Sequence, residues 1–427
     1  MLKVSVSGIR GIVPQDFNPE VVIKYVNAFS RIIDGNRVLL ARDTRPHGAL
    51  FYDIAKRTLQ FSGMDVYSIG IAPTPTAQFM NRNMNLDGGI ILTASHNPIE
   101  WNALKLSGKG GRFLYREELD RMLELIDSFK WSEKWGNVVE ITDAVERHID
   151  AILKSPFALK KSGVRVVADC VNGAMYEALP YLLRKLGADV KGIYCEPTGE
   201  FLRSPEPRGE HLKHLNEFLK GDFELAFATD PDGDRMVFGV KGRGILSEEM
   251  TIVAGIDYIL SKEKGDVVVN YSTSILVEFV AQRHGVKVHR APVGEANVLR
   301  RMEEVGALVG GEGNGGLIFP RINATRDGLL SAAVIYSSYV EGRLMELLDS
   351  LPQTYMFKGK VETGNVEDVL KRFQPLVEGF ELITEDGYYF RKGNSWLHIR
   401  PSNTEPIVRV YAESLEREFI ERVKASI

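Results

Sequence analysis

A serine follows an apolar run at residue 95, in a setting typical of reacting side chains. The apolar run spans residues 89–92, and the polar turn after it, residues 93–98, reads Thr-Ala-Ser-His-Asn-Pro. Buried strands of α/β folds present such side chains at their carboxyl ends, and a proline ends the strand's hydrogen bonding. Ser95 is therefore a candidate nucleophile or phosphate carrier, although most serines before Asn-Pro only shape a turn. The hydrolase pattern G-x-S-x-G is excluded, because Thr93 and Asn97 occupy its glycine positions.

A second polar turn, after the apolar residues 225–228, carries aspartates at alternate positions. They are Asp230, Asp232 and Asp234. Carboxylate oxygens grouped in this way suit a hard divalent cation such as Mg²⁺. An ordinary solvated turn and a calcium EF-hand loop are the alternatives. The EF-hand loop requires Gly at its sixth position and Glu at its twelfth, where this chain has Arg235 and Lys241, so that interpretation is excluded.

A glycine-rich turn, residues 310–316, carries one carboxylate and one amide, Glu312 and Asn314. It satisfies the dinucleotide pattern G-x-G-x-x-G, but that pattern must open a helix and be followed about 20 residues later by an acidic ribose ligand. Here it leads into the strand-like residues 317–320, and residues 330–333 contain no acid. A nicotinamide cofactor is therefore not expected. Glycines still let the backbone approach a ligand closely, so this turn could bring Glu312 and Asn314 to sugar hydroxyls.

A fourth polar turn, residues 400–406, reads Arg-Pro-Ser-Asn-Thr-Glu-Pro and has an arginine three residues beyond it. A guanidinium, hydroxyls, an amide and turn N–H groups form a receptor for a phosphate dianion. The candidate phosphate ligands are Arg400, Ser402, Asn403, Thr404 and Arg409. A plain polar turn between two strands is the alternative when this motif is considered alone.

Together, these four turns resemble the motifs of the α-D-phosphohexomutases, the family of phosphomannomutase/phosphoglucomutase and phosphoglucosamine mutase. The resemblance covers essentially the whole chain in the family's order, beginning with residues 7–11, Ser-Gly-Ile-Arg-Gly. It implies that Ser95 carries a phosphoryl group and that Mg²⁺ is held by this group and the three aspartates. It also implies that a hexose phosphate exchanges phosphate with Ser95 through a hexose 1,6-bisphosphate intermediate.

The resemblance also implies roles for four charged or titratable residues. Lys105 and Arg10 support acid/base chemistry or the transition state, and His96 and Arg235 lie within active-site motifs. A lysine acts as a general base only when its pKa is depressed, which a nearby metal and arginines would do. The alternative for Lys105 is a surface charge beside the glycine-rich residues 107–111.

Several positions depart from the commoner family motifs, and they leave the preferred sugar open. Ala103 stands where glycine is usual, Asn314 replaces a common serine, and Gly316 stands where some members carry histidine. Residues 402–404, Ser-Asn-Thr, favour phosphomannomutase/phosphoglucomutase over phosphoglucosamine mutase, which more often has glycine at position 403. Two other classes of function are alternatives to a mutase. One is a metal-dependent sugar phosphatase, in which water attacks the phosphoserine. The other is a non-catalytic sugar-phosphate sensor, which would not need Ser95.

The composition is typical of a soluble enzyme. The chain has 427 residues, a hydrophobic share of 44% and a net charge of −4, which shows no basic excess for nucleic acid. The two cysteines, Cys170 and Cys195, form no C-x-x-C motif, so we expect a reduced, cytoplasmic protein without structural zinc, with pairing of the two cysteines in the fold as the alternative. Residues 1–6 lack the apolar core of a signal peptide, and no uncharged segment reaches membrane-spanning length. A homo-oligomer is compatible with these features.

A strand, a polar turn and a helix-compatible segment recur three times along the chain. The strands are residues 37–41, 164–168 and 266–270. They predict three tandem α/β units, with one enlarged Rossmann-like sheet as the alternative. After residue 351 the apolar segments are typical of antiparallel strands around turns, ended by a helix. The resemblance favours three similar α/β domains with mixed sheets and a C-terminal α+β domain around a central cleft. We place the domains, which carry the phosphoserine, metal, sugar and phosphate loops in that order, at residues 1–150, 151–246, 247–350 and 351–427.

Overall fold

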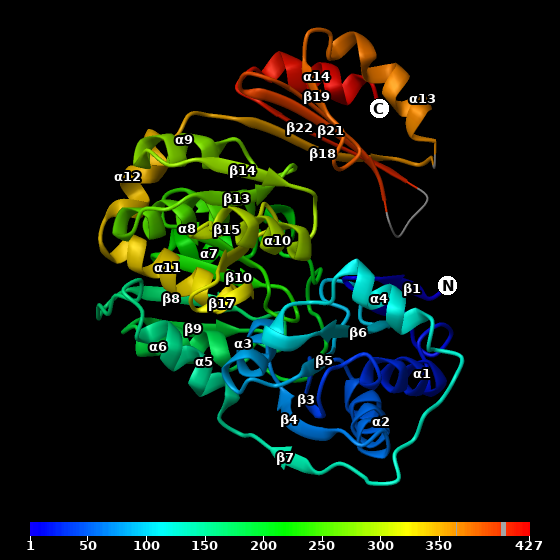
Figure 1. Ribbon diagram of the computed structural model, residues 1–427. Coiled ribbons are helices and arrows are strands. Elements are labelled where there is room, and N and C mark those ends of the chain that lie inside the picture. Colours follow the sequence, from blue (N-terminus) through cyan, green and yellow to red (C-terminus); the bar gives the residue numbers. More distant parts are fainter. Residues whose placement is uncertain (364, 403–406) are drawn as a thin grey trace. The chain divides into compact units, whose positions relative to one another are not determined.

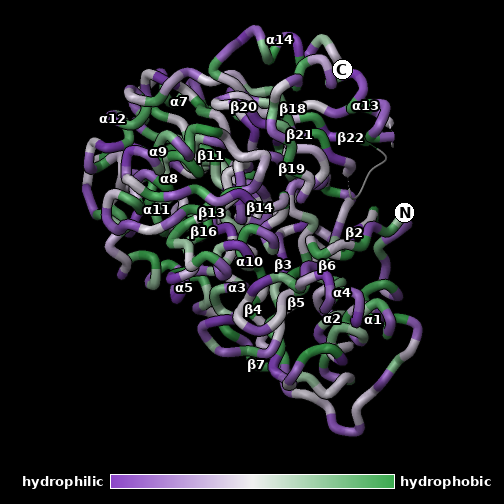
Figure 2. Tube along the Cα trace, turned by 45° about the horizontal axis from the view of Figure 1, so that its top comes forward, coloured by the Kyte–Doolittle hydropathy of each residue, from purple (hydrophilic) through white to green (hydrophobic). Residues whose placement is uncertain are grey.

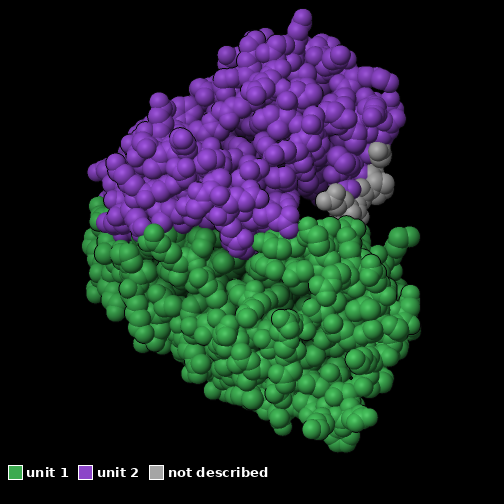
Figure 3. All heavy atoms as spheres, in the orientation of Figure 1, with its two compact units in different colours: residues 1–251, 315–341 green, residues 252–314, 342–427 purple. Residues whose placement is uncertain are grey.

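The computed structural model describes residues 1–363, 365–402 and 407–427. It divides into two compact units, each made of two segments of the chain (Figure 3). Unit 1 comprises Met1–Thr251 and Gly315–Glu341, and unit 2 comprises Ile252–Asn314 and Gly342–Ile427. The chain leaves unit 1, returns to it and leaves it again, so neither unit is one continuous stretch.

A seven-stranded sheet forms the first part of unit 1, in the order β1-β2-β6-β5-β3-β4-β7 (Figure 1). Its strands are β1 Lys3–Ser5, β2 Gly8–Ile12, β3 Arg37–Arg42, β4 Asp65–Ile71, β5 Gly88–Leu92, β6 Trp101–Ser107 and β7 Val138–Glu140. Strands β5, β3, β4 and β7 are parallel, whereas β2 and β6 run antiparallel to their neighbours. The helices are α1 Pro19–Ser30, α2 Gly48–Phe61, α3 Thr74–Asn83, α4 Arg116–Leu123 and α5 Ala144–Leu153.

Strand β3 explains why this sheet is covered on both faces. Val38 and Leu40 pack into a core with α1, α2 and α4, whereas Leu39 and Ala41 pack into another core with α3 and α5. All four side chains are buried. Alternate residues of a strand point to opposite faces, so a run of consecutive apolar residues requires helices on both sides.

A five-stranded sheet forms the second part of unit 1, in the order β12-β11-β10-β8-β9. Its strands are β8 Arg165–Asp169, β9 Asp189–Ile193, β10 Leu225–Thr229, β11 Met236–Val240 and β12 Gly244–Ile245. Strands β10, β8 and β9 are parallel, and β11 and β12 continue the sheet as antiparallel strands. Its helices are α6 Ala178–Lys185 and α7 Leu215–Lys220. The second segment of unit 1 adds a hairpin, β16 Gly316–Phe319 and β17 Asn323–Arg326, and helix α11 Gly328–Val340, which packs against α5 and α6.

Unit 2 contains parallel strands and a separate antiparallel sheet. The parallel strands, in the order β14-β13-β15, are β13 Val267–Asn270, β14 Val288–Ala291 and β15 Val309–Glu312. The helices before and around them are α8 Glu249–Lys262, α9 Leu276–His284, α10 Glu295–Val305 and α12 Arg343–Ser350. The antiparallel sheet has the order β18-β22-β21-β20-β19. Its elements are β18 Tyr355–Val361, β19 Glu381–Ile383, β20 Tyr388–Lys392, β21 Ser395–Pro401, β22 Val408–Ser414, α13 Val366–Phe373 and α14 Arg417–Ala425.

The separate sheets exclude the alternative of one enlarged Rossmann-like sheet. The expected α/β sheets with mixed strand directions and the antiparallel C-terminal sheet are both confirmed. Figure 2 shows apolar and polar residues interleaved along the chain. None of the helices in the described ranges has both the length and the hydropathy that a bilayer-spanning helix requires.

Within unit 2, buried polar contacts at Glu413 join the antiparallel sheet to the segment after β13. One carboxylate oxygen accepts a hydrogen bond from the Ser274 hydroxyl at 2.6 Å. The other accepts the N–H of Ile275 at 2.7 Å and the indole N–H of Trp396 at 3.2 Å. Glu413 is 1% exposed. Buried donors need their acceptors, so this interface depends on the carboxylate.

Replacing Glu413 with Gln should lower the free energy of unfolding by about 1–3 kcal/mol, because the amide nitrogen would face a donor that has lost its acceptor. Chemical denaturation followed by tryptophan fluorescence measures the change. Glu378→Gln, at an exposed position of the same unit, is the control and should stay within about 0.5 kcal/mol of the unchanged protein. Equal stability of the two variants would contradict the role given to Glu413.

Candidate active site

The hydroxyl of Ser95 lies just beyond the carboxyl end of β5 and reaches the aspartate loop that follows β10. Its Oγ donates a hydrogen bond to Oδ2 of Asp230 at 3.0 Å, although the two residues are 135 positions apart. The backbone of Ser95 is left-handed, with φ 50°, and its N–H donates to the hydroxyl of Thr93. This conformation costs a non-glycine residue about 1–2 kcal/mol, so the surrounding structure must hold Ser95 in place.

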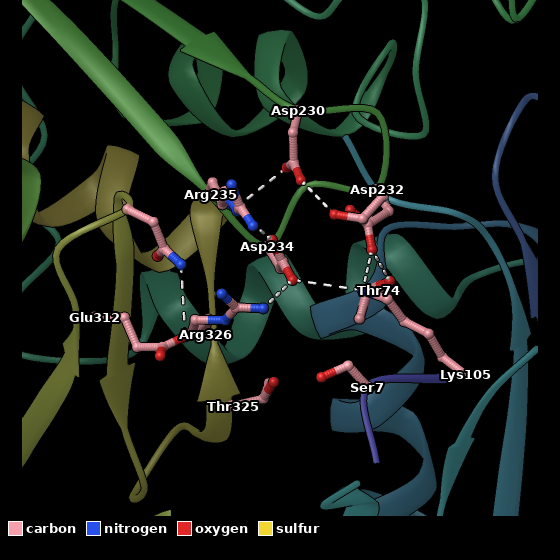
Figure 4. A network of polar contacts seen from close by, with 12 residues as sticks. Ser7, Thr74, Lys105, Asp230, Asp232, Asp234, Arg235, Glu312, Thr325 and Arg326 are labelled. Atoms are coloured by element: carbon pink, nitrogen blue, oxygen red, sulfur yellow. Dashed lines mark hydrogen bonds and ion pairs between the residues drawn. The ribbon is translucent and has the colours of Figure 1, made fainter. Parts of the chain in front are cut away.

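The three aspartates after β10 form one buried cluster (Figure 4). One carboxylate oxygen from each lies within 4.8 Å of the others, and no other group of three His, Cys, Asp or Glu in the described ranges is placed to share a metal ion. Oδ1 of Asp230 accepts the N–H of Gly233 at 3.1 Å and that of Arg235 at 3.2 Å, which closes the turn. Gly233 has φ 75°, and an added Cβ would meet the Met175 side chain at 2.7 Å, so the turn requires glycine.

The cluster fits a divalent cation. Oδ1 of Asp232 and Oδ1 of Asp234 are buried and accept no hydrogen bond from any described residue. Burial raises the pKa of Asp230 well above its ordinary value, and the charges of Asp234 and Asp232 raise it further. A hard dication would stabilise three buried carboxylates that retain oxygens for ligation, so Mg²⁺ suits this residue set.

Three cationic side chains pair with the cluster, the most distant of them Arg235, with Nε 3.7 Å from Oδ1 of Asp234. Nζ of Lys105 lies 2.5 Å from Oδ2 of Asp232 and 3.5 Å from Oδ2 of Asp234, and Arg326 donates to the same Asp234 oxygen at 2.6 Å. Burial would lower the pKa of Lys105, but the charges of Asp232 and Asp234 outweigh it, so the pKa is raised. The depressed pKa that a general base requires is expected from a bound metal and nearby arginines; in the cluster itself the nearest charges are carboxylates, and they act in the opposite direction. A surface position is also excluded, since Lys105 is 3% exposed.

The serine loop, residues 93–98, contains His96 and lies beside Arg10 and Arg235. Arg10 donates to the side-chain oxygen of Asn97 at 3.0 Å. Nδ1 of His96 lies 3.3 Å from Oγ of Ser95. Burial lowers the pKa of His96 well below its ordinary value, and the charges of Arg235 and Arg10 lower it further. At neutral pH His96 is therefore an uncharged imidazole among permanent cations.

Arg45 is a central residue that the sequence analysis does not identify. Its side chain is fully buried, and its Nε lies 3.1 Å from Oδ2 of Asp43. The guanidinium donates to the backbone carbonyls of Ser95 at 2.7 Å, Asn97 at 2.8 Å and Pro98 at 2.7 Å. Three carbonyls of the serine loop thus accept hydrogen bonds from one rigid guanidinium group. In the sequence, Arg45 follows an apolar strand, and this position does not distinguish a buried arginine from an exposed one.

Thr74 and Arg326 also contribute to the cluster without having been predicted. Thr74, the first residue of α3, donates its hydroxyl to Oδ2 of Asp232 at 2.7 Å. Arg326 is the last residue of β17 and reaches Asp234 across 92 positions of sequence. The Arg-Asp-Gly sequence at 326–328 is a local signal that could have identified Arg326. No comparable signal marks Thr74.

The predicted sugar-binding residues lie in unit 2. Oε1 of Glu312 accepts the side-chain N–H of Asn270 at 2.9 Å and the N–H of Gly294 at 2.8 Å. The Asn314 amide nitrogen lies 3.5 Å from Oε2 of Glu312. Glu312 is 3% exposed. The structure thus brings Glu312 and Asn314 together at the end of β15, with the carboxylate held in one orientation.

The predicted phosphate receptor begins at the end of β21 in unit 2. Arg400 and Arg409 are directly opposite each other on β21 and β22. Opposite residues of an antiparallel pair project to the same face, so both guanidinium groups lie on one face of the sheet. The N–H of Ser402 continues the pairing of the two strands with a hydrogen bond of 2.9 Å. Asn403 and Thr404 lie outside the described residues.

The acidic cluster predicts one site for a divalent cation. In a calorimetric titration with Mg²⁺, Asp232→Asn should weaken binding at least about tenfold, because one fewer negative charge at ligand distance is worth more than 1.4 kcal/mol. Asp34→Asn, at an exposed position of the same unit, is the control and should bind like the unchanged protein. Equal affinities of the two variants would place the cation elsewhere.

Four models of phosphoglucomutase/phosphomannomutase domains match this chain. The alpha/beta/alpha domain I matches residues 1–132, and alpha/beta/alpha domain II matches residues 146–244. The alpha/beta/alpha domain III matches residues 247–355, and the C-terminal domain matches residues 356–427. The matches follow one another along the chain and cover almost all of it.

Individual proteins agree with these matches. A phosphoglucomutase/phosphomannomutase of Thermococcus kodakarensis is 35% identical over 96% of this chain and 94% of its own. A protein of Methanopyrus kandleri named "Probable phosphoglucosamine mutase" is 33% identical over 99% of this chain and 97% of its own. A solved structure from Burkholderia thailandensis, a phosphoglucomutase/phosphomannomutase family protein, has the same fold, with a TM-score of 0.86, 22% identity, and coverage of 99% of this chain and 98% of that one. The chain therefore belongs to the phosphoglucomutase/phosphomannomutase family and is a phosphomutase, an intramolecular phosphotransferase of the isomerase class.

Proposed function

We propose that this chain interconverts hexose 6-phosphate and hexose 1-phosphate through a phosphoserine at Ser95 and a hexose 1,6-bisphosphate intermediate. The observation that carries the proposal is the Ser95 hydroxyl, 3.0 Å from Asp230 within a buried cluster of three aspartates. Phosphoryl transfer depends on positioning and charge, and this arrangement supplies both. Mg²⁺ held by the aspartates, with Ser95 as a further ligand, would offset the negative charge of the transferring group.

The side chains around Ser95 have distinct roles in this proposal. Lys105, Arg10 and Arg235 provide the positive charge that holds a phosphate dianion. Lys105, which is paired with Asp232 and Asp234, is placed to act as a charged hydrogen-bond donor to the phosphoryl oxygens. His96 stays neutral and is a hydrogen-bonding partner for Oγ of Ser95. The charge on the transferring group is thus met by cations that do not change protonation state near neutral pH.

The burial of the serine supports a mutase rather than a phosphatase. Ser95 is 4% exposed, and the three aspartates are at most 1% exposed. A phosphatase must admit water to the phosphoserine, whereas a mutase must keep water away and deliver a sugar hydroxyl. A non-catalytic sugar-phosphate sensor is also disfavoured, because it has no use for a strained, buried hydroxyl at a metal cluster.

The substrate is proposed to be bound by residues of unit 2. Glu312 and Asn314 would contact sugar hydroxyls. The proposed ligands of the distal phosphate are Arg400, Ser402, Asn403, Thr404 and Arg409. Residues 402–404 and the Thermococcus relative support phosphomannomutase/phosphoglucomutase activity. Phosphoglucosamine mutase is the second candidate, because several relatives at 30–33% identity bear that name.

The proposed setting is the cytoplasm, with a hexose phosphate as the small-molecule partner. The net charge of −4 argues against a nucleic-acid partner. We propose domain limits at residues 1–150, 151–246, 247–350 and 351–427, so that each domain carries one of the four functional turns.

One assay decides the reaction class and the sugar. With Mg²⁺ and glucose 1,6-bisphosphate, the protein should convert mannose 1-phosphate and glucose 1-phosphate to the 6-phosphates at least about tenfold faster than glucosamine 1-phosphate. Ser95→Ala should lower turnover by more than about 10³-fold, because the phosphate carrier is lost, whereas Ser128→Ala, at an exposed position, should not. Release of inorganic phosphate that outpaces 6-phosphate formation would favour a phosphatase. Preference for glucosamine 1-phosphate would favour the second candidate.

Replacing Arg45 with Lys should lower kcat about 10- to 100-fold and leave KM within about twofold, because one ammonium cannot hold three carbonyls and Ser95 would shift. Steady-state kinetics with glucose 1-phosphate measures both constants, and thermal unfolding shows whether the variant is folded at the assay temperature. Arg57→Lys, exposed on α2, is the matched control. If the kcat of the variant equals that of the control, Arg45 does not position the nucleophile.

A further inference from the structure

The two cysteines of the chain meet in unit 1, beside the sheet that carries the aspartate loop. Cys170 directly follows β8, and Cys195 lies two residues beyond β9. Their sulfur atoms are 2.8 Å apart. Backbone hydrogen bonds hold the two segments together: the N–H of Cys170 donates to Ile193 O at 3.2 Å, and that of Asn172 donates to Tyr194 O at 2.5 Å. The sulfur contact is therefore anchored by the backbone on both sides.

The two thiols differ in accessibility and acidity. Cys195 is partly exposed, whereas Cys170 is buried, and neither is in a disulfide. The hydrogen bond with Cys170 lowers the pKa of Cys195, and burial raises the pKa of Cys170 well above its ordinary value. An oxidant from solvent would therefore react first at Cys195, and Cys170 lies within reach to resolve the product.

The segment after Cys170 supports the aspartate loop. The N–H of Ala174 donates to the carbonyl of Pro231 at 2.7 Å. A Cβ on Gly173 would lie 2.6 Å from Cα of Pro231, so the two backbones are in close contact. Val171 and Asn172 between them are left-handed, with φ 49° and 53°. This conformation is strained for a β-branched residue such as Val171, so the segment cannot absorb a displacement of Cys170 freely.

We propose that Cys170 and Cys195 are an oxidation site for hydroperoxides, at which an intramolecular disulfide forms and displaces the backbone that supports the aspartate loop. The thiolate of Cys195 attacks the peroxide and the O–O bond breaks, so that a sulfenic acid forms; the departing alkoxide or hydroxide takes up the proton that Cys195 had released to solvent and leaves as alcohol or water. The sulfur of Cys170 then attacks the sulfenic sulfur while its proton passes to the departing hydroxide, so that the S–S bond forms and water leaves. The two sulfurs lose two electrons, which the peroxide takes up.

The disulfide requires the sulfurs to approach from 2.8 Å to about 2.05 Å. This displacement is small, but it acts on a segment that donates a hydrogen bond of 2.7 Å to Pro231, the residue between the first two aspartates of the cluster. An effect on turnover rests on the proposed function, whereas disulfide formation and the loop displacement do not. The test therefore measures the chain itself rather than its activity.

The chain is treated with a small excess of hydrogen peroxide, remaining thiols are alkylated, and peptides are mapped by mass spectrometry. Free thiols should fall from two to none, with a Cys170–Cys195 peptide pair that dithiothreitol cleaves. Hydrogen exchange of residues 225–236 should change at least about twofold on oxidation, while that of residues 395–401 in unit 2 should not. Cys195→Ser should show neither the disulfide nor the change in exchange.

Two results would overturn the proposal. One is oxidation that stops at sulfinic acid or links separate chains, because the sulfurs would then not be in contact. The other is an intramolecular disulfide with unchanged exchange of residues 225–236, because the aspartate loop would then not depend on Cys170. Cys170→Ser is a second variant that removes the same disulfide. If both variants lose the disulfide and the change in exchange, the loss is due to the oxidation site and not to destabilisation by Cys195→Ser.

Discussion

The burial of three aspartates in one cluster is the constraint on which the rest of unit 1 depends. Carboxylates within 4.8 Å repel one another by about 3 kcal/mol per pair at an effective dielectric constant near 20. Apolar packing cannot offset this repulsion at a desolvated site, so positive groups and donors must come from elsewhere in the chain. Lys105 comes from β6, Arg326 from β17 and Thr74 from α3. Each lies on a different element, so the cluster depends on three elements of unit 1 besides its own loop.

The conformation of the serine loop is a second constraint. It explains why the loop is built on the parallel pair of strands β3 and β5. Ser95 is left-handed, and its own sequence neighbours do not impose that conformation. The loop after β3 supplies Arg45, and the loop after β5 supplies Ser95; β3 and β5 are parallel neighbours, so both loops emerge at the same edge. Arg45 can therefore bind three carbonyls of the serine loop while remaining buried. The sheet therefore fixes Arg45 and Ser95 relative to each other.

Turn chemistry explains how much could be predicted from the sequence. Separate α/β sheets follow from polar turns placed after apolar strands, whereas the convergence of Ser95 with the aspartates, which lie after strands of two different sheets, is implied only by the family resemblance. Arg45 gives no such signal, because an arginine after a strand is buried or exposed only according to its tertiary partners. A metal and arginines near Lys105 would lower its pKa, but the sequence does not show that two carboxylates lie against its ammonium group and raise the pKa. For the same reason Glu413, an acid within a strand, could not be assigned to an interface.

Under the proposed function, charge and sugar recognition fall to different residues: those around Ser95 lie in unit 1, and Glu312 and Asn314 lie in unit 2. The residues around Ser95 act on a phosphoryl group through charge and geometry, and a phosphoryl group presents the same oxygens on every hexose. Discrimination between hexoses must instead come from hydrogen bonds to particular hydroxyl or amino groups, which an ill-matched site leaves unpaired. Glu312 and Asn314 are the candidates, and position 314 is where this chain departs from the common family motif. Relatives with different named sugars can therefore share the same surroundings of the serine, and Glu312, held by Asn270 and Gly294, is the residue on which we propose that the preference of this chain depends.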